Sequence, residues 1–303
     1  MPLGFGRSIL SKPIVAAAGG DTAYAWTDNG NTDSGNKATY IPYFSTEPLN
    51  RTTSVSFVQW VRMKDTTDST LDDGLSRIIS LSGNGFNSQA SLIMGSNPAD
   101  TYMNLLDGSG KNQIVNPTKA GGPGASTSDW QTNAFDGAWH CIMASINSNQ
   151  ATTDCTYFFD GQDCTSIPGG NQNKSPGLHY LDTTNYIRYR NIEYGDLDYY
   201  VANAQECGQD FHLGPTWIYD SYLDFTSSTV RDYFYNAANT DGFVDGGTDG
   251  TAGGAPTPDV YIYHDGTDLQ SSPAFTSDNE VTTGTGAIVV ISNTEGPGSG
   301  DTI

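Results

Sequence analysis

Between about residues 38 and 292 the sequence repeats one pattern, in which short runs of aromatic and β-branched residues are separated by turns rich in Gly, Asn, Asp and Ser. Runs of this kind at a spacing of roughly 8–12 residues are typical of β sandwiches and barrels. The runs that predict strands are 55–61, 77–81, 91–94, 102–106, 139–146, 155–159, 162–167, 186–190, 216–219, 260–263 and 287–291. We therefore predict an all-β fold, a single antiparallel β sandwich over residues 38–292.

Two local signals add detail to this prediction. The pair Asp160-Gly161 stands between two of the runs and predicts a type I′ hairpin, because both central positions of that turn need a positive φ. Residues 226–236 are the one segment with helical spacing, since Val230, Tyr233 and Phe234 fall on one face and Thr226 is a suitable N-cap. We expect this short helix to be a plug on the surface of the sandwich.

The composition agrees with a β fold and narrows the range of partners. Only 16% of the 303 residues are charged, and five Glu and six Lys are too few for a helical bundle or a coiled coil. The net charge is −21 and the 13 Lys and Arg are scattered along the chain, whereas a protein that binds nucleic acid needs clustered basic residues. We therefore expect no nucleic-acid partner and no anionic membrane partner.

The segments that flank the sandwich differ from it in composition. Residues 1–20 end in Ala16-Ala-Ala-Gly-Gly20 and predict an N-terminal docking arm with a flexible joint. Residues 21–37 are expected to be a linker or edge segment, and residues 293–303 a C-terminal tail of Gly, Ser, Pro and acidic residues. The composition of residues 236–258 predicts a long loop. The N-terminus lacks the long apolar stretch of a targeting segment, so we expect none there.

The arm has the pattern of a strand that adds to the edge of another sheet. In an extended chain Leu3, Phe5 and Ile9 fall on one side, where they can fill alternate pockets. Small residues occupy the other side, and Arg7 and Lys12 suit an acidic neighbour, including another copy of this chain. We predict that Leu3, Phe5, Arg7, Ile9 and Lys12 bind a partner, with an unstructured chain start as the alternative.

Catalytic patterns are weak in this sequence. Glycoside hydrolysis needs two carboxylates with different pKa values, and the nearest arrangement is Glu193-Tyr-Gly-Asp196-Leu-Asp198. Asp196 and Asp198 would share a strand face but Glu193 would not, and Gly195 indicates a turn. We therefore predict no catalytic residues and no enzymatic activity.

The residues that could bind a metal ion or a sugar, and the cysteines, can each be explained by a structural role instead. Asp clusters at 65–73, 241–249 and 265–268 contain oxygens that calcium prefers, but Asp is also a common turn residue. Calcium stays an open alternative and no cofactor is required. Four cysteines (Cys141, Cys155, Cys164 and Cys207) are expected to be reduced and packed in strands, without a zinc site. Trp26, Trp130, Tyr199 and Tyr200 could stack on sugars or pack in the core.

Several motifs, taken in order, resemble a known family. The segments are Pro48-Leu-Asn-Arg-Thr52 with Ser56-Phe-Val-Gln-Trp-Val61, Asp136-Gly-Ala-Trp-His140, Tyr157-Phe-Phe-Asp-Gly161, Trp217-Ile-Tyr-Asp220 with Leu223 and Phe234, Pro258-Asp-Val-Tyr-Ile262, and Gly284-Thr-Gly-Ala-Ile288. Together they resemble the concanavalin A-like lectin/glucanase (laminin-G-like) domains of tailed-phage structural proteins. The resemblance implies a jelly roll of two antiparallel sheets with Trp60, Trp139 and Phe159 in its core. The opening MPLGFGRSILSK also resembles the start of structural proteins of marine phages.

These features lead to one expected function and two rivals. We expect a non-enzymatic structural protein on the capsid or tail surface of a tailed-phage virion, present in many copies after assembly in the host cytoplasm. Its partners would be other virion structural proteins and copies of itself. The first rival is an adhesin that binds a host surface glycan, and the second is a glycoside hydrolase.

Overall fold

Sixteen strands make up most of the regular structure in the part of the chain that the computed structural model describes. That part comprises residues 23, 25–28, 38–43, 53–63, 75–82, 89–95, 102–107, 110–115, 132–134, 136–147, 154–165, 186–192, 211–265, 269–272, 277–282, 288–291 and 296–298. The strands are β1 Ala25–Asp28, β2 Ala38–Tyr43, β3 Ser54–Met63, β4 Leu75–Ser82, β5 Gln89–Gly95, β6 Tyr102–Asp107, β7 Gly110–Val115, β8 Trp139–Asn147, β9 Asp154–Phe159, β10 Gln162–Asp163, β11 Tyr186–Ile192, β12 Phe211–Tyr219, β13 Val260–His264, β14 Leu269–Ser272, β15 Ser277–Thr282 and β16 Ile288–Ile291. A short helix, α3 (Ser228–Arg231), and a 3₁₀ turn, η3 (Thr240–Gly242), follow β12.

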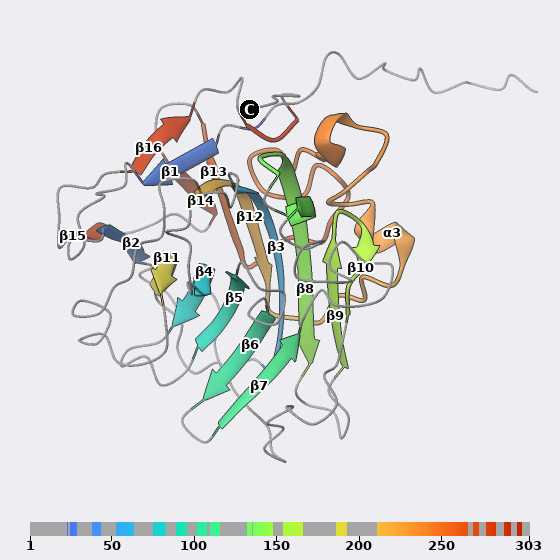
Figure 1. Ribbon diagram of the computed structural model, residues 1–303, viewed down its shortest axis with the longest axis horizontal. Coiled ribbons are helices and arrows are strands. Elements are labelled where there is room, and N and C mark those ends of the chain that lie inside the picture. The colour runs from blue at the N-terminus through green and yellow to red at the C-terminus, as the bar shows by residue number, and fades with distance from the viewer. Residues whose placement is uncertain are drawn as a thin grey trace, which may run out of the picture.

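The strands form two antiparallel sheets, which Figure 1 shows as two layers. The nine-stranded sheet has the order β10-β9-β8-β3-β12-β1-β16, with β13 on β12 and β14 on β13. The seven-stranded sheet has the order β15-β2-β11-β4-β5-β6-β7. The chain passes repeatedly from one sheet to the other, so the fold is the two-sheet antiparallel jelly-roll sandwich that the sequence predicts.

The strand predictions are confirmed, and the sequence missed five strands. Each predicted run overlaps an observed strand, although the run at 162–167 is a strand only at Gln162–Asp163 and the run at 287–291 only at Ile288–Ile291. Asp160 and Gly161 have φ values of 49° and 72°, as the predicted hairpin requires. Among the strands that were not predicted, β1 comes from the segment expected to be a linker or edge and lies between β12 and β16.

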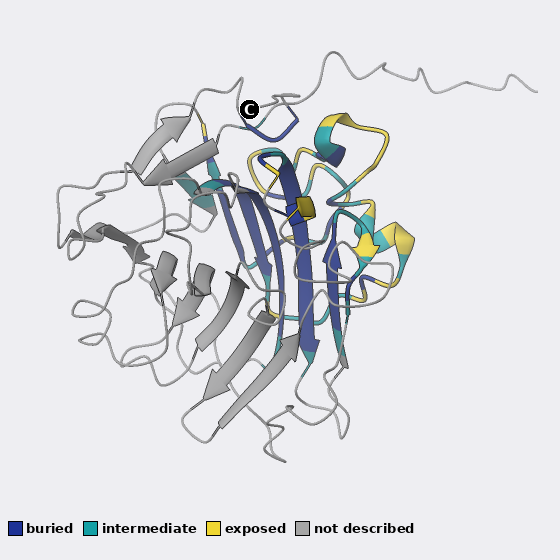
Figure 2. Ribbon diagram, in the orientation of Figure 1, coloured by how far each residue is buried: buried dark blue, intermediate teal, exposed yellow. Residues whose placement is uncertain are grey.

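The central strands of the nine-stranded sheet are buried on both faces, as Figure 2 shows for β3, β8 and β12. Phe57 and Ile142 are fully buried and lie on one face of this sheet, because Phe57 pairs with Ala144, two residues along β8 from Ile142. Residues on the opposite face form an aromatic core that includes Trp60, Trp139 and Trp217, each 3% exposed. The predicted core positions of Trp60, Trp139 and Phe159 are therefore confirmed.

Residues 220–258, which we name the cover segment, lie over this aromatic face. Phe225, Phe234 and Phe243 of the cover segment pack into the core cluster of the sheet, and the ring of Phe234 meets Trp217 edge-on at 4.8 Å. The start of the segment is held by a pair of buried hydroxyls. Ser145 and Ser56 are hydrogen-bonded at 2.7 Å, and Ser56 also donates to the carbonyl of Ser221 at 2.7 Å. The predicted long loop is thus a third layer over the sheet.

The predicted helix is much shorter than its apolar spacing indicates. Only Ser228–Arg231 is α-helical, and the residue at the N-cap is Ser227 rather than Thr226, so the prediction of a helix over 226–236 was wrong in both respects. Irregular turns beyond Arg231 place Phe234 in the core and leave Tyr233 and Val230 packed against it. Tertiary packing of these aromatic rings has overridden the helical spacing.

Three residues close to the C-terminus complete the fold by packing on the same chain. Gly296, Pro297 and Gly298 are buried, and the carbonyl of Pro297 accepts a hydrogen bond from the Ala23 amide at 3.2 Å. The Gly298 amide donates to Asp241 Oδ2 at 3.1 Å, which joins this turn to the cover segment. The Pro297 ring lies against Gly214, where a Cβ would approach it to 2.7 Å.

Candidate functional site

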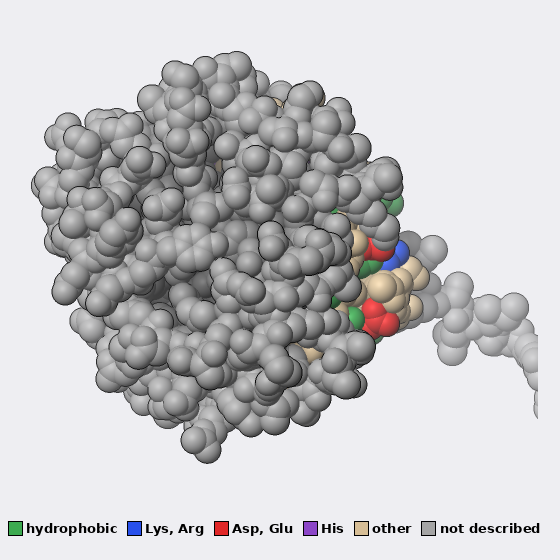
Figure 3. Space-filling model, turned by 60° about the horizontal axis from the view of Figure 1, so that its bottom comes forward, with side chains coloured by type: hydrophobic (Ala, Val, Ile, Leu, Met, Phe, Trp, Pro, Cys, Tyr) green, Lys and Arg blue, Asp and Glu red, His purple; other side chains and the backbone are tan. Residues whose placement is uncertain are grey.

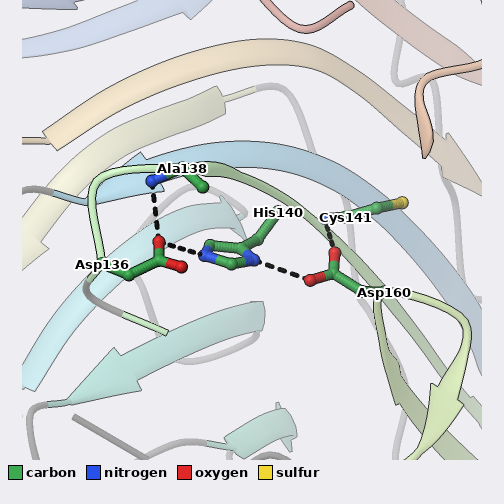
Figure 4. Close-up of polar contacts among 5 residues, drawn as sticks. All are labelled: Asp136, Ala138, His140, Cys141 and Asp160. Atoms are coloured by element: carbon green, nitrogen blue, oxygen red, sulfur yellow. Dashed lines mark hydrogen bonds and ion pairs between the residues drawn. The ribbon is translucent and has the colours of Figure 1, made fainter. Parts of the chain in front are cut away.

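The clearest cluster of titratable side chains in the described residues is a buried histidine between two carboxylates. His140, the second residue of β8, is 5% exposed. Its Nδ1 lies 2.7 Å from Asp160 Oδ2, and its Nε2 lies 3.0 Å from Asp136 Oδ1. Figure 4 shows the imidazole ring held between the two carboxylates from opposite ends. We call this group the Asp–His–Asp cluster.

Each carboxylate is held by the backbone as well as by His140. Asp136 Oδ1 accepts a hydrogen bond from the Ala138 amide at 2.7 Å, within the turn that leads into β8. Asp160 Oδ1 accepts from the Cys141 amide at 2.8 Å, and the Asp160 amide donates to the Cys141 carbonyl at 2.9 Å. The hairpin register, which sets Phe159 opposite Ile142, carries Asp160 to this position.

The two carboxylates determine the charge of the histidine. Burial alone would lower the pKa of His140, but the hydrogen bonds and negative charges of Asp136 and Asp160 outweigh it and raise the pKa from 6.5 to about 9. Partial burial opposes ionisation of Asp136, yet the hydrogen bonds from His140 and Ala138 lower the pKa of its carboxyl. At neutral pH the ring is therefore an imidazolium that donates from both nitrogens.

This arrangement favours stabilisation over catalysis. A general base needs a ring nitrogen that can accept a proton, whereas both nitrogens of His140 are engaged as donors to carboxylates. The neighbouring thiol of Cys141 is fully buried, and burial, with a further contribution from Asp160, raises its pKa well above the ordinary value. A reactive cysteine needs the opposite shift. The cluster therefore acts as an ionic clasp between the turn at 136–138, β8 and the β9–β10 hairpin.

Tyr235 of the cover segment contacts the hairpin that carries Asp160 of the Asp–His–Asp cluster. The ring of Tyr235 lies on Gly161, where a Cβ would come within 2.9 Å of it, and stacks on Trp60 at a centroid distance of 6.3 Å. Burial and the nearby charge of Asp160 raise the pKa of the Tyr235 hydroxyl. The Asp160-Gly161 hairpin therefore contacts both His140 and the third layer.

Two of the described Asp residues of the predicted calcium clusters, Asp245 and Asp249, cap turns. Asp245 Oδ1 accepts from the Gly247 amide at 2.7 Å, and Asp249 Oδ1 accepts from the amide and hydroxyl of Thr251. In the described part of the chain no three His, Cys, Asp or Glu side chains are grouped so as to hold a metal ion. The cluster at 65–73 lies outside the described residues, so calcium binding stays a prediction.

The predicted partner-binding residues Leu3, Phe5, Arg7, Ile9 and Lys12 also lie outside the described residues. The same holds for Trp130, Tyr199 and Tyr200, for Cys207, and for the carboxylates at 193–198; of Trp26 only the backbone is described. Among the described cysteines, Cys141, Cys155 and Cys164 are in the reduced thiol form, as expected, and Cys141 and Cys164 are buried.

The sequence prediction missed the Asp–His–Asp cluster. Its three residues stand in two of the motifs that carry the family resemblance, Asp136–His140 and Tyr157–Gly161. The available signal was incomplete: the Asp160-Gly161 turn predicts the pairing of β9 with β10, whereas the register of β9 against β8, which the turn does not fix, brings Asp160 to His140.

The surface around α3 mixes charges. Asp224 and Asp232 are exposed and Arg231 is half-buried, and Figure 3 shows acidic, basic and polar side chains side by side here. Arg231 donates to the carbonyls of Phe225 and Thr226 at 2.7 and 2.9 Å, so its hydrogen bonds hold together the cover segment in which it lies. In the described residues no helix is long and apolar enough to cross a bilayer.

Comparisons with known proteins give likeness in structure alone. No family model and no curated protein sequence matches the chain. Among solved structures, the chain is similar to domains LG4-5 of the mouse laminin alpha1 chain, with 13% identity and a TM-score of 0.38 over 72% of this chain and 48% of that one. It is also similar to the receptor-binding domain of botulinum neurotoxin type G (12% identity, TM-score 0.39, 75% and 54% coverage). The binding domain of botulinum neurotoxin serotype D has the same identity and TM-score, with 85% and 54% coverage. The chain spans about half the length of each of these structures.

Proposed function

We propose that this chain is a non-enzymatic structural protein of a tailed-phage virion, located on the capsid or tail surface in many copies. Residues 1–20 would anchor it, with Leu3, Phe5 and Ile9 filling pockets on a partner and Arg7 and Lys12 facing acidic groups. The partners would be other virion structural proteins and copies of the chain itself. The protein would be assembled into particles in the host cytoplasm.

The observation that supports this proposal is that the described side chains with catalytic potential are engaged in structural contacts. Both nitrogens of His140 are bound to carboxylates, and the Cys141 thiol beside it is buried. The Asp–His–Asp cluster and the cover segment add stability to a sandwich, which suits a component that must persist in a particle. The family resemblance of motifs such as Asp136–His140 adds the expectation of a phage protein.

The rival function of a glycan-binding adhesin needs exposed aromatic rings on the sandwich. Trp60, Trp139 and Trp217 are buried beneath the cover segment or beside it, so these three rings pack in the core. Binding of purified host glycans by the isolated protein, retained after deletion of the arm, would favour the adhesin. Release of reducing ends from a polysaccharide panel would favour the hydrolase.

The decisive experiment measures incorporation into particles. A phage in which codons 2–12 are deleted is compared with one in which the same residues are replaced by a Gly-Ser sequence of equal length, and with the wild type. Copies per particle are counted by quantitative mass spectrometry, and circular dichroism of each purified protein checks the fold. We expect both variants to fold and to be lost from particles. Normal occupancy of either variant would overturn the role of the arm.

A separate pair of variants divides the arm's two contributions. Replacing Leu3, Phe5 and Ile9 by Ser removes the apolar side, and replacing Arg7 and Lys12 by Gln removes the charge while keeping a flexible polar side chain. We expect the first variant to lose incorporation at all salt concentrations. The second should lose it most strongly at low salt, because screening already weakens the charge contribution at high salt.

A further inference from the structure

The chain enters the sandwich at Ala23 and β1, shortly after the predicted arm and beside the edge of the nine-stranded sheet. Strand β1 pairs with β16 in an antiparallel register that sets Ala25 opposite Ile291 and Asp28 opposite Ile288. The chain therefore enters β1 at the same end at which it leaves β16, and the hydrogen bond from Ala23 to Pro297 holds the two segments together there. Figure 1 shows β1 and β16 side by side at one border of the molecule.

Strand β16 ends the order of its sheet and pairs, among the described strands, with β1 alone. Its sequence is Ile-Val-Val-Ile, without a charge, a proline or a glycine. Successive residues of an antiparallel strand direct their backbone groups to alternate sides, so half of the N–H and C=O groups of β16 face away from β1. Natural sheets protect edges of this kind with charges, prolines or a covering segment.

We propose that the outer edge of β16 binds residues 2–12 of a second copy of this chain as an added strand. This inference rests on the proposed function, since it names the partner surface for the arm. The occupant has the required pattern: Leu3, Phe5 and Ile9 alternate with Gly4, Gly6 and Ser8, which is how a strand presents one apolar side. Added strands gain affinity from backbone hydrogen bonds and specificity from alternate side chains.

Charge favours a copy of the same chain as the acceptor. Residues 1–20 contain Arg7 and Lys12 and no acidic residue, whereas all 34 Asp and Glu lie after residue 20 in a chain of net charge −21. Two bodies of this charge repel each other. A cationic arm that reaches from one copy onto the other offsets part of that repulsion at the point of contact.

The position of the arm's exit also favours reciprocal exchange. Because the exit at Ala23 and the β16 edge are neighbours on one chain, a two-fold axis beside β16 brings each exit next to the edge of the other copy. Such an interface uses the same surface twice and closes as a dimer. Residues 13–22 can span up to roughly 33–36 Å when extended, which is enough to cross between adjacent edges.

The test is complementation between two defective variants. The acceptor lacks residues 2–12 and keeps its edge; the donor keeps its arm and carries a proline in β16, either Val289→Pro or Val290→Pro. Adjacent residues direct their N–H groups to opposite sides, so one of these prolines removes a β1 hydrogen bond and the other blocks the outer edge. The variant with the smaller loss of thermal stability is the edge-blocked donor.

Association is measured by sedimentation velocity at low salt. We expect the wild type to self-associate, each variant alone to be monomeric, and an equimolar mixture to associate at least about tenfold more tightly than either variant alone, a difference of about 1.4 kcal/mol. Failure of the mixture to associate, or wild-type association by the chain that lacks its arm, would overturn the proposal. A monomeric wild type whose arm resists protease would overturn it in favour of pairing with its own edge.

Hydrogen exchange gives a second measurement that does not depend on the proline variants. The outward amides among residues 288–291 should exchange at least about tenfold more slowly in the wild type than in the chain without residues 2–12, because edge amides lose protection when no strand covers them. Equal exchange would contradict the proposal. If complementation succeeds but deletion of the arm leaves particle incorporation unchanged, the docking site stands and the anchoring function fails.

Discussion

Raising the pH from about 6 to about 10 should remove about 3 kcal/mol of folding free energy through His140 alone. The pKa of His140 is about 9 in the folded chain, against an ordinary value of 6.5. The folded state therefore binds this proton more tightly than the unfolded state does. The stabilisation is complete below pH 6.5, declines between pH 6.5 and 9, and is absent above that range.

The magnitude follows from the size of the shift. Each unit of pKa difference corresponds to about 1.4 kcal/mol, and the shift from 6.5 to about 9 gives about 3 kcal/mol. His140 is only 5% exposed, so screening by solvent reduces this value little, although both carboxylates retain some contact with water. On the acid side the lowered pKa of Asp136 acts in the opposite sense: its contribution is present above about 3.8 and is lost as the pH falls through the folded value.

The assay is urea unfolding at a series of pH values from about 5 to 10 for the wild type, H140Q and D160N. H140Q removes the titrating group, so subtracting its profile from that of the wild type cancels the Tyr, Lys and Cys titrations that both share. We expect a difference profile that falls by about 3 kcal/mol with a midpoint between pH 6.5 and 9.

D160N serves as the matched control for charge. It keeps the side-chain size of Asp160 and removes its charge, which helps to raise the pKa of His140. The alkaline loss of stability should therefore begin near pH 6.5 in both proteins, but in D160N it should be smaller and should end at a lower pH than in the wild type. A flat difference profile between wild type and H140Q, or an NMR titration of His140 with a midpoint at or below pH 6.5, would refute the ionic clasp.

Three further outcomes follow from the contacts. Gly161→Ala should destabilise the fold by about 1–3 kcal/mol in thermal unfolding, since its Cβ would lie 2.9 Å from Tyr235; Gly254→Ala, also at positive φ but with an ordinary 3.5 Å contact, should cost less, and equal losses would contradict the steric argument. Gly214→Ala should destabilise by a similar amount and Pro297→Gly should relieve part of that loss, because the added Cβ would meet the proline ring at 2.7 Å; no relief in the double variant would place the strain elsewhere. If calcium binds an Asp cluster, EDTA should lower the melting temperature, and an unchanged melting curve would exclude stabilisation by bound calcium.

The strands and the hairpin could be predicted because their signals are local. Alternation over a few residues indicates a strand, and Asp160-Gly161 needs only its own two φ values to make its turn. The predicted length of the helix was wrong for the opposite reason. Val230, Tyr233 and Phe234 have helical spacing, but packing against the aromatic face of the nine-stranded sheet determines where their side chains lie. The same face accounts for the packing of Phe243 in the cover segment, within the residues 236–258 that composition alone predicted to be a loop.

The Asp–His–Asp cluster could not be predicted from local patterns, because His140 and Asp160 are 20 residues apart in the sequence. Asp136 and His140 are four residues apart across a turn, but Asp160 arrives from the far end of the next strand. Its place is set by a register in which Cys155 faces Ile146 and Phe159 faces Ile142, and a slip of one residue would turn every side chain of β9 to the other face. The motifs that suggest a family therefore contain the two halves of one ionic contact. The bond from Asp160 to the Cys141 amide, together with the contact of Gly161 with Tyr235, makes that contact the point where turn, hairpin and cover segment meet.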